Sequence, residues 1–240
     1  MSTVAIIQAR MGSTRLPGKV LLPLLNEPVL VHDVRRVGRA TSLDEVVVAT
    51  TVEPQDDPIE ALARANAWPV VRGSEADLLE RYLLAARRFG ASRVVRVTSD
   101  CPLIDPGLID RVVWALDAAG ADYASITLPP RSWPRGLDVE AFTREALEAA
   151  GADDNDPASR EHATPYIYRH PERFGLVAVP SARDLSAHRW TLDTPEDYAL
   201  ISRIYDALGS DTFGWEDALM LVEANPEWSA LNRDVRQKEH

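Results

Sequence analysis

The sequence has little cysteine, no long hydrophobic run and no excess of positive charge, and each shortage excludes a class of protein. Its single cysteine, Cys101, cannot form an intrachain disulfide. Its longest apolar runs, such as the one around Val112–Leu116, are far too short to cross a bilayer. Because the N-terminus also lacks a basic region followed by a long apolar stretch, we expect no secretory signal. Together these absences predict a cytoplasmic protein with no membrane partner.

Negative charge dominates the chain, since 37 Asp and Glu residues stand against 26 Lys and Arg, which gives a net charge of −11 at pH 7. Such a surface repels nucleic acid, so we expect no nucleic-acid partner. Positive charge is nevertheless concentrated near the N-terminus, at Arg10, Arg15 and Lys19. Composition alone favours ordinary surface side chains, but an acidic protein with one basic loop is suited to a small anionic ligand.

Apolar, β-branched runs alternate with helical patterns over the first 120 residues. The runs predict buried parallel strands at Thr3–Ala9, Val46–Thr51 and Arg93–Thr98. Helices are predicted at Pro28–Arg39, Pro58–Ala67, Glu75–Phe89 and Pro106–Ala119. Asp57 and Asp105 stand in the N-cap positions before two of the prolines. This alternation predicts an α/β fold with a mostly parallel central sheet and helices on both faces.

The second half of the chain is less regular. Three prolines in Leu128–Pro134 exclude regular structure there, and Asp153–Pro157 reads as an acidic loop. Strands are predicted at Gly136–Phe142, Phe174–Val179 and Arg189–Leu192, and helices at Thr143–Ala150 and Thr194–Leu208. We therefore expect one domain over residues 1–240, with an excursion at about residues 129–173 and a polar tail at residues 226–240.

The residues Gln8–Lys19 directly follow the first predicted strand, at the end where open α/β sheets bind ligands. Glycine lets backbone N–H groups approach a phosphate, and arginine supplies planar, bidentate donors. The loop therefore predicts a triphosphate site. It is not a Walker A loop, because five residues separate Gly12 from Gly18 and Val20 stands where that motif requires Ser or Thr. The alternative is a connecting loop with incidental charges, for which it is unusually long.

Two aspartates follow other predicted strands and are suited to Mg²⁺, which takes one or two carboxylates beside phosphate oxygens. Asp100 comes directly after a central strand, and Asp105 is already used as a helix cap. Asp193 lies between a strand and a helix that Thr194 caps, which leaves its carboxylate free. The alternatives are a turn residue for Asp100 and a dipole-stabilised helix terminus for Asp193.

Five strings in order resemble the spore-coat polysaccharide cytidylyltransferase-like family, which is similar to the CMP-KDO and CMP-sialic acid synthetases. They are Ile7–Lys19, Thr98–Asp105, Pro134–Glu140, Arg160–Tyr166 and Trp190–Asp197. The resemblance runs from residue 3 to about residue 205. It implies a Rossmann-related, GT-A-like nucleotidyltransferase domain that uses CTP and Mg²⁺ to activate a sugar or sugar acid in polysaccharide biosynthesis, with release of pyrophosphate. The CMP-KDO synthetases carry a Gln-Gly-Asp-Glu-Pro-type string where this chain has Thr98–Pro102, which leaves the sugar open.

The resemblance also implies roles for particular residues. Arg10, Arg15 and Lys19 would contact the triphosphate, with Met11, Gly12 and Ser13 of the same loop. Asp100 and Asp193 would hold Mg²⁺. Arg15, Lys19 and Asp100 are the predicted catalytic residues.

Two further groups are candidates for substrate binding. Arg72 and Ser74 would contact base or ribose, although a turn in which Ser74 caps the next helix explains them equally well. Arg135, Asp138, Glu161 and His162 would recognise sugar hydroxyls and a sugar carboxylate. For His162, helix packing or a subunit interface is an equal alternative.

The expected reaction is in-line attack of a sugar hydroxyl, or alternatively a sugar phosphate, on the α-phosphate. No side chain stands out as general base. Cys101 has no activating base in the sequence, so a buried, inert thiol is expected. A glycosyltransferase that consumes a nucleotide sugar is one alternative. It needs no pyrophosphate chemistry, so it would give Arg15 and Lys19 no role. A non-catalytic nucleotide-binding subunit is the other alternative. The charged residues that catalysis would need are all present, which opposes it: Arg10, Arg15, Lys19, Asp100 and Asp193.

The excursion at about residues 129–173 predicts a symmetric homodimer. Aromatic residues stand beside arginines there, and both types are enriched at interfaces. The residues are Trp133, Tyr166 and Tyr168 with Arg131, Arg135, Arg169 and Arg173. Related synthetases pair through this region, so His162 or Arg135 of one chain is expected to reach the other chain's crevice. The alternative is a mobile surface excursion.

Overall fold

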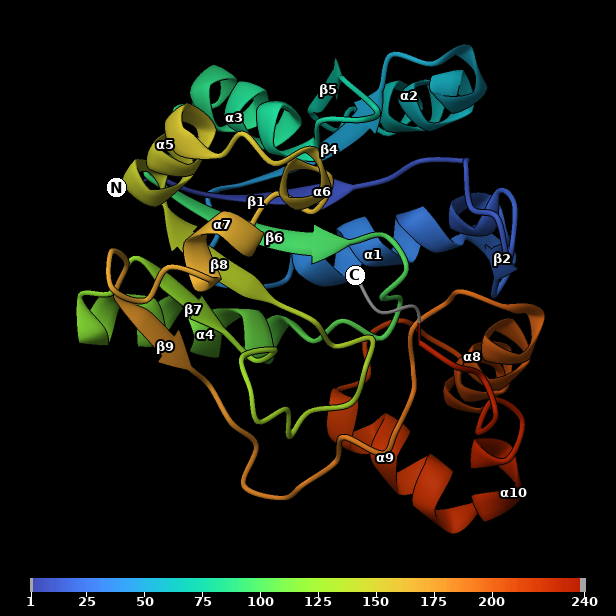
Figure 1. The fold of residues 1–240 in the computed structure, drawn as a ribbon. Coiled ribbons are helices and arrows are strands. Elements are labelled where there is room, and N and C mark those ends of the chain that lie inside the picture. Colours follow the sequence, from blue (N-terminus) through green and yellow to red (C-terminus); the bar gives the residue numbers. More distant parts are fainter. Residues whose placement is uncertain (1, 238–240) are drawn as a thin grey trace.

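A seven-stranded sheet organises the computed structural model, which describes residues 2–237 (Figure 1). The strand order is β5-β4-β1-β6-β8-β7-β9. The strands are β1 (Thr3–Gln8), β4 (Glu45–Thr51), β5 (Val70–Gly73), β6 (Arg93–Thr98), β7 (Tyr123–Ser125), β8 (Glu140–Thr143) and β9 (Leu176–Ala178). A separate short hairpin joins β2 (Pro23–Leu24) to β3 (Glu27–Pro28).

The sheet is mostly parallel, as predicted. β1 pairs in parallel with β4 and β6, while β8 runs antiparallel to both of its neighbours. From β1 the chain moves outward to β4 and β5, and then returns to form β6 on the other side of β1. Gln8 is opposite Thr98 in this register, so the carboxyl ends of β1 and β6 lie side by side. This reversal of strand order is where open α/β sheets bind ligands.

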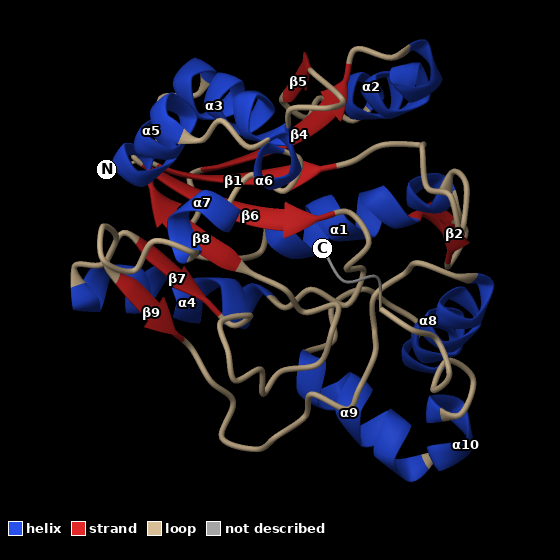
Figure 2. Cartoon of the chain, viewed as in Figure 1, coloured by secondary structure: helices blue, strands red, loops and turns tan. Residues whose placement is uncertain are grey.

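Helices cover both faces of the sheet, which confirms the predicted fold class (Figure 2). They are α1 (Val29–Val37), α2 (Asp57–Ala65), α3 (Leu78–Arg88), α4 (Pro106–Ala119), α5 (Arg144–Asp153), α6 (Pro157–Arg160), α7 (Pro165–Tyr168), α8 (Pro195–Leu208), α9 (Trp215–Ala224) and α10 (Pro226–Ser229). Alternate residues of β1 enter different cores: Ala5 and Ile7 pack with α1, α4 and α8, and Val4 and Ile6 with α3 and α5. No helix within residues 2–237 is long and apolar enough to cross a membrane.

Local chemistry explains which predicted boundaries hold. Arg93–Thr98 and Pro106–Ala119 are correct to the residue, and the Asp105 side chain caps α4 by accepting from the N–H of Leu108 at 2.9 Å. Thr194 caps α8 within a reciprocal capping box with Asp197.

Three predicted details are wrong. Asp57 is the first residue of α2 rather than its cap, and the preceding Asp56 instead accepts a hydrogen bond from the N–H of Met11 at 2.7 Å. The predicted strand Gly136–Phe142 begins only at Glu140. Arg189–Leu192 forms no strand, because its pairing with the 135 segment is limited to a single bridge.

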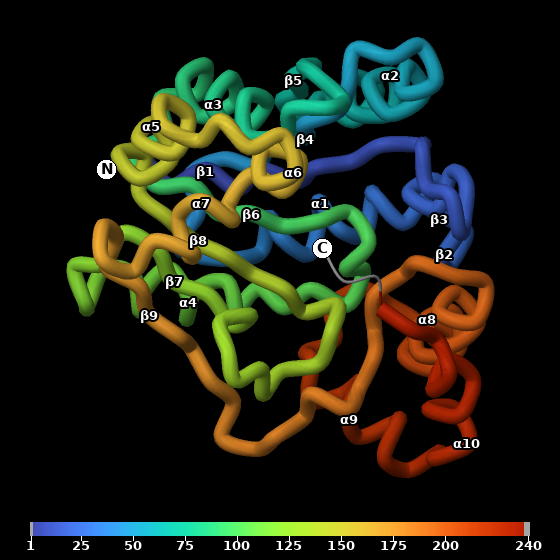
Figure 3. The backbone as a smooth tube through the Cα atoms, in the orientation of Figure 1, coloured from blue at the N-terminus to red at the C-terminus, as the bar shows by residue number. Residues whose placement is uncertain are grey.

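The excursion, whose backbone Figure 3 traces, and the tail both contribute buried residues, such as Trp133 and Asn232. Trp133 is 2% exposed, and its ring lies edge-on to that of Trp215, with the ring centroids 5.1 Å apart. Its indole N–H donates to the carbonyl of Val179. It therefore belongs to the core, and its expected place at an interface is wrong. In the predicted tail, the Gln237 side chain accepts from Arg189 at 2.5 Å. Residues 238–240 of that tail lie outside the described residues.

Gly136→Ala should be far more destabilising than an ordinary glycine substitution. Gly136 has φ +99°, and a Cβ there would lie 2.3 Å from the carbonyl carbon of Trp190. Gly120, at the end of α4, also has positive φ (+57°) but faces open space, so Gly120→Ala is the matched control. We expect about 1 kcal/mol of destabilisation for the control and at least twice that for Gly136→Ala. Urea unfolding measures both, and equal losses would contradict the close approach.

Candidate functional site

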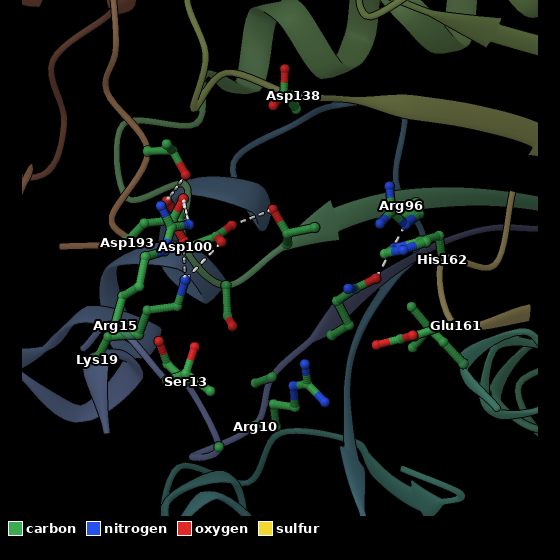
Figure 4. Close-up of a pocket in the computed structure, with 18 of the residues that line it drawn as sticks. Arg10, Ser13, Arg15, Lys19, Arg96, Asp100, Asp138, Glu161, His162 and Asp193 are labelled. Carbon is green, nitrogen blue, oxygen red and sulfur yellow. Dashed lines mark hydrogen bonds and ion pairs between the residues drawn. The ribbon is translucent and has the colours of Figure 1, made fainter. Parts of the chain in front are cut away.

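The carboxyl ends of β1 and β6 open into a cavity of about 470 Å³ (Figure 4). Its walls include most of the residues that the sequence singles out. These are Arg10, Gly12, Ser13, Arg15, Lys19, Asp100, Asp138, Glu161, His162 and Asp193. The predicted loop, both predicted carboxylates and part of the predicted sugar site thus share one space, while their roles stay predictions.

One side of the cavity holds a cluster of opposite charges (Figure 4). The Lys19 Nζ atom lies 2.8 Å from Asp100 Oδ2 and 2.8 Å from Asp193 Oδ1. Arg15 Nη2 lies 2.8 Å from the other oxygen of Asp193. Gly18, in the left-handed conformation (φ +69°), leads into the short 3₁₀ turn that starts with Lys19. Residues distant in sequence therefore meet around one ammonium group.

Contacts within the cluster favour the charged forms of Lys19 and Asp100. Burial alone would lower the pKa of Lys19, but the carboxylates of Asp100 and Asp193 outweigh burial and raise it. Burial would likewise raise the pKa of Asp100, yet the Lys19 charge and hydrogen bond lower it to about 2. Opposite charges at hydrogen-bond distance favour the charged form of each partner. Both groups are therefore charged at neutral pH.

A second layer of ion pairs positions Asp193. The Arg189 guanidinium donates two hydrogen bonds, of 2.8 and 2.9 Å, to the carboxylate of Asp197. It also donates to the carboxylate of Asp193 at 3.1 Å. Asp197 in turn accepts from the backbone N–H groups of Asp193 and Thr194 at 3.0 Å. The N–H of Leu192 donates to the carbonyl of Asp100 at 2.8 Å, which ties the two aspartate loops together.

The opposite side of the cavity carries a polar network that sequence reasoning missed. Arg96 on β6 pairs with Glu140 on β8 and donates to Gln8 at 3.1 Å. Tyr82 donates to the same Gln8 oxygen at 3.0 Å, and Tyr123 donates to Glu140 at 3.0 Å. One signal in the sequence could have found this network. Arg96 and Glu140 each stand in a strand that is otherwise largely buried, and charged residues are rarely buried there unless they are paired.

Arg81 on α3 also lines the cavity and was missed, because it stands among the apolar residues of a helical pattern. Figure 4 shows Arg96, Glu161 and His162 across the cavity from the Lys19 cluster. The cavity thus has a cationic and acidic end and a separate end rich in hydrogen-bonding groups.

Four predicted residues do not line the cavity. Arg72 is bound by Asp57 at 2.7 Å and Glu60 at 2.8 Å, so it joins β5 to α2 rather than facing a base or ribose. Ser74 accepts from the N–H of Asp77 in the turn before α3. Met11 packs against the core, and the backbone of Arg135 pairs with the segment at Arg189.

Two other predicted features have a clear setting. Cys101 is 1% exposed, and burial raises the pKa of its thiol well above the usual range, which fits an inert side chain. Within residues 2–237 no three His, Cys, Asp or Glu side chains gather as a metal site. Asp100 and Asp193 nevertheless converge on one cation, the Lys19 ammonium, and Mg²⁺ needs only two carboxylates when phosphate and water supply its other oxygens. The donor set therefore fits this metal.

Comparison with known proteins finds relatives that match nearly the whole chain. The sequence profile of the cytidylyltransferase family matches residues 4–225. The spore coat polysaccharide biosynthesis protein SpsF of Bacillus subtilis is 34% identical over 96% of this chain and 97% of its own. A cytidylyltransferase structure from Leptospira borgpetersenii is 36% identical, with a TM-score of 0.91 and full coverage of both chains. A CMP:2-keto-3-deoxy-manno-octonic acid synthetase complexed with CTP shares the fold at 17% identity and a TM-score of 0.65, over 87% of this chain and 99% of its own.

A buried carboxyl group lies under the charged cluster. Asp33 on α1 is 0% exposed, and neither of its oxygens has a hydrogen-bond partner within residues 2–237. Burial raises its pKa well above the usual range, and the charge of Asp100 adds to this, while Arg36 and Lys19 oppose it. An unpartnered, buried carboxylate is costly, so the folded state favours the protonated form of Asp33 more strongly than the unfolded chain does.

Asp33→Asn should therefore change the pH dependence of stability. The folded pKa of Asp33 lies above its unfolded value of about 3.9, so wild-type stability falls as pH rises from the unfolded toward the folded pKa. Relative to wild type, the variant should gain on the order of 1–3 kcal/mol at high pH and little near the unfolded pKa. Urea unfolding of both proteins between about pH 4 and about pH 8 measures this. Parallel pH profiles would show that Asp33 does not titrate as described.

Proposed function

The chain belongs to the cytidylyltransferase family, and we propose that it transfers CMP from CTP to a sugar or sugar acid, releasing pyrophosphate, in polysaccharide biosynthesis. The observation that carries this proposal is the meeting of Lys19, Asp100 and Asp193 at the end of a glycine- and arginine-containing loop. The similarity to SpsF supports the biosynthetic setting. We place the reaction in the cytoplasm and in a single domain over residues 1–240.

The loop after β1 is proposed to bind the triphosphate. Gly12 and Ser13 line the cavity and leave room for phosphate oxygens, and Arg10 lies at its edge with a 47% exposed side chain. Arg15 and Lys19 bring two positive charges to the same place. Positive groups fixed in advance stabilise charge that develops on a leaving pyrophosphate.

Asp100 and Asp193 are proposed to hold Mg²⁺. When bound, the ion would neutralise phosphate charge and help to orient the reacting groups. The chain's own contribution is to aim both carboxylates at one point, which the Lys19 and Arg189 contacts achieve. Lys19 is then free to turn its ammonium group toward the nucleotide.

The sugar is proposed to bind opposite this cluster, near Asp138, Glu161 and His162. There a sugar hydroxyl attacks the α-phosphorus and its proton passes to solvent. The bond from that phosphorus to the bridging oxygen breaks, and pyrophosphate takes the electron pair. The Arg96–Glu140 pair borders the same space and fixes its polar wall. Acceptors and donors in one pocket suit a polyhydroxylated substrate.

Release of pyrophosphate tests the proposed function. We expect purified protein with CTP, Mg²⁺ and a panel of sugars and sugar acids to release pyrophosphate with at least one of them. Arg15→Ala or Lys19→Ala should lower kcat/KM by about 10²–10³-fold, the scale for losing one preorganised charged donor. Arg203→Ala, an exposed arginine on α8, is the control and should leave the rate unchanged. Turnover of a nucleotide sugar without pyrophosphate would instead identify a glycosyltransferase.

We also propose that the chain acts as a symmetric homodimer through residues 129–173. Tyr166 and Tyr168 lie beside Arg173 and Arg169, and both arginines are exposed. His162 lines the cavity of its own chain. The dimer contact would therefore stabilise this wall of the cavity and would not need to contribute His162 to the cavity of the other chain.

Light scattering tests the dimer. At micromolar concentration the wild type should have the mass of two chains, and the double variant Arg169→Glu, Arg173→Glu should shift toward one, because like charges would face each other across a symmetric contact. Arg203→Glu controls for the change in net charge. A fully active wild-type monomer would refute the proposal.

A further inference from the structure

Arg81 is a buried cation with two guanidinium nitrogens that have no hydrogen-bond partner within the described part of the chain. Its residue is 4% exposed, yet its Nε and Nη1 atoms are shielded from solvent and have no hydrogen-bond partner within residues 2–237. Burial lowers the pKa of this guanidinium. Because a buried charge without partners is costly, its presence on a cavity wall points to a ligand that completes it.

The surroundings of Arg81 hold it in place without pairing with it. Its stem packs on Gly73, where a Cβ would lie 3.3 Å from Arg81 Cγ. The neighbouring Asp56 is already engaged, since it accepts from the N–H of Met11 and from the Thr51 hydroxyl. Glu75 contacts Arg10 at 3.4 Å instead. The guanidinium is thus fixed at the cavity with unused donors.

The wall around Arg81 suits a flat heterocycle better than a phosphate. Leu78, one helical turn earlier on α3, lines the same cavity and offers apolar surface. Glu75 adds a carboxylate to that wall, which would repel phosphate but can accept from an amine. The two basic side chains best placed for a triphosphate, Arg15 and Lys19, belong to the separate cluster at Asp193. A nucleotide whose phosphates reach that cluster can place its base against Leu78 and Arg81.

We infer that Arg81 is a specificity-determining residue that donates to the O2 and N3 atoms of cytosine, while Glu75 accepts from the exocyclic amine. This inference rests on the proposed use of CTP. Cytosine presents two adjacent acceptors and one donor, which match a guanidinium and a carboxylate. Uracil carries an N–H at position 3 and a carbonyl at position 4, so it would set donor against donor and acceptor against acceptor.

Calorimetric titration without any sugar tests this contact. The ligands are CTP, UTP and inorganic tripolyphosphate, and the proteins are wild type, Arg81→Met, Glu75→Gln and the control Arg88→Met, an exposed arginine on the same helix. Wild type and the control should prefer CTP to UTP. Arg81→Met should lose about 10–100-fold in CTP affinity, the scale for hydrogen bonds from a charged donor, and keep its tripolyphosphate affinity within about twofold. Glu75→Gln should narrow the preference for CTP, since its amide can donate to uracil O4.

Thermal unfolding of the ligand-free proteins separates a binding role from a structural one. Replacing an unpaired buried charge by methionine should raise the Tm by at least about 2 °C, whereas loss of a structural arginine would lower it. The inference is overturned if Arg81→Met binds CTP like wild type, if its CTP and tripolyphosphate affinities fall together, if wild type does not prefer CTP, or if the Tm falls. Because the titration contains no sugar, its outcome does not depend on turnover. Arg81-dependent CTP binding together with no pyrophosphate release for any member of the separate sugar panel would reject the proposed function and leave this contact standing.

Discussion

Lys19 places one ammonium group between the carboxylates of Asp100 and Asp193, 2.8 Å from each, and the arrangement of the site depends on this double ion pair. It joins the loop after β1, the loop after β6 and the turn before α8. Taking charges out of water is costly, so such a cluster persists only where every member is paired. The carboxylates also converge on a position that a metal cation can share. Under the proposed function, the same contacts that stabilise the loops would also prepare them for a nucleotide and its ion.

The remainder of the fold keeps these charged groups together. The pairing of β1 with β6 sets Gln8 beside Thr98, and each strand then leads into one side of the cavity. Gly136 lets the segment at Trp190 approach so closely that no side chain fits between them. Behind Asp193, Asp197 belongs to the capping box of α8 and also accepts two hydrogen bonds from Arg189. The helix cap thereby also holds the segment that carries Asp193. Arg81 is the exception, since its Nε and Nη1 atoms are buried without a hydrogen-bond partner within residues 2–237, and we infer that a ligand completes it.

Sequence reasoning succeeds where the signal is local. The hydrophobic runs locate β1 and β6, the aspartate before a proline locates the start of α4, and the spacing of glycine and basic residues locates the loop. It fails where the outcome depends on distant partners. Arg72 was expected at the base, but Asp57 and Glu60 on α2 bind its guanidinium. Trp133 was expected at an interface, but Trp215 covers it. Nothing in the pattern of α3 indicates that Arg81 Nε and Nη1 lack hydrogen-bond partners among the described residues. That depends on Asp56, which accepts from the N–H of Met11 instead.

A crystal structure with Mn²⁺ and a non-hydrolysable CTP analogue tests the central claim most directly. Anomalous scattering locates the metal, and the map locates Lys19. We expect one manganese peak within bonding distance of both Asp100 and Asp193, with the Lys19 ammonium moved from the aspartates onto a phosphate. A nucleotide bound outside this cavity, or a metal held elsewhere while Lys19 still bridges the two aspartates, would contradict it.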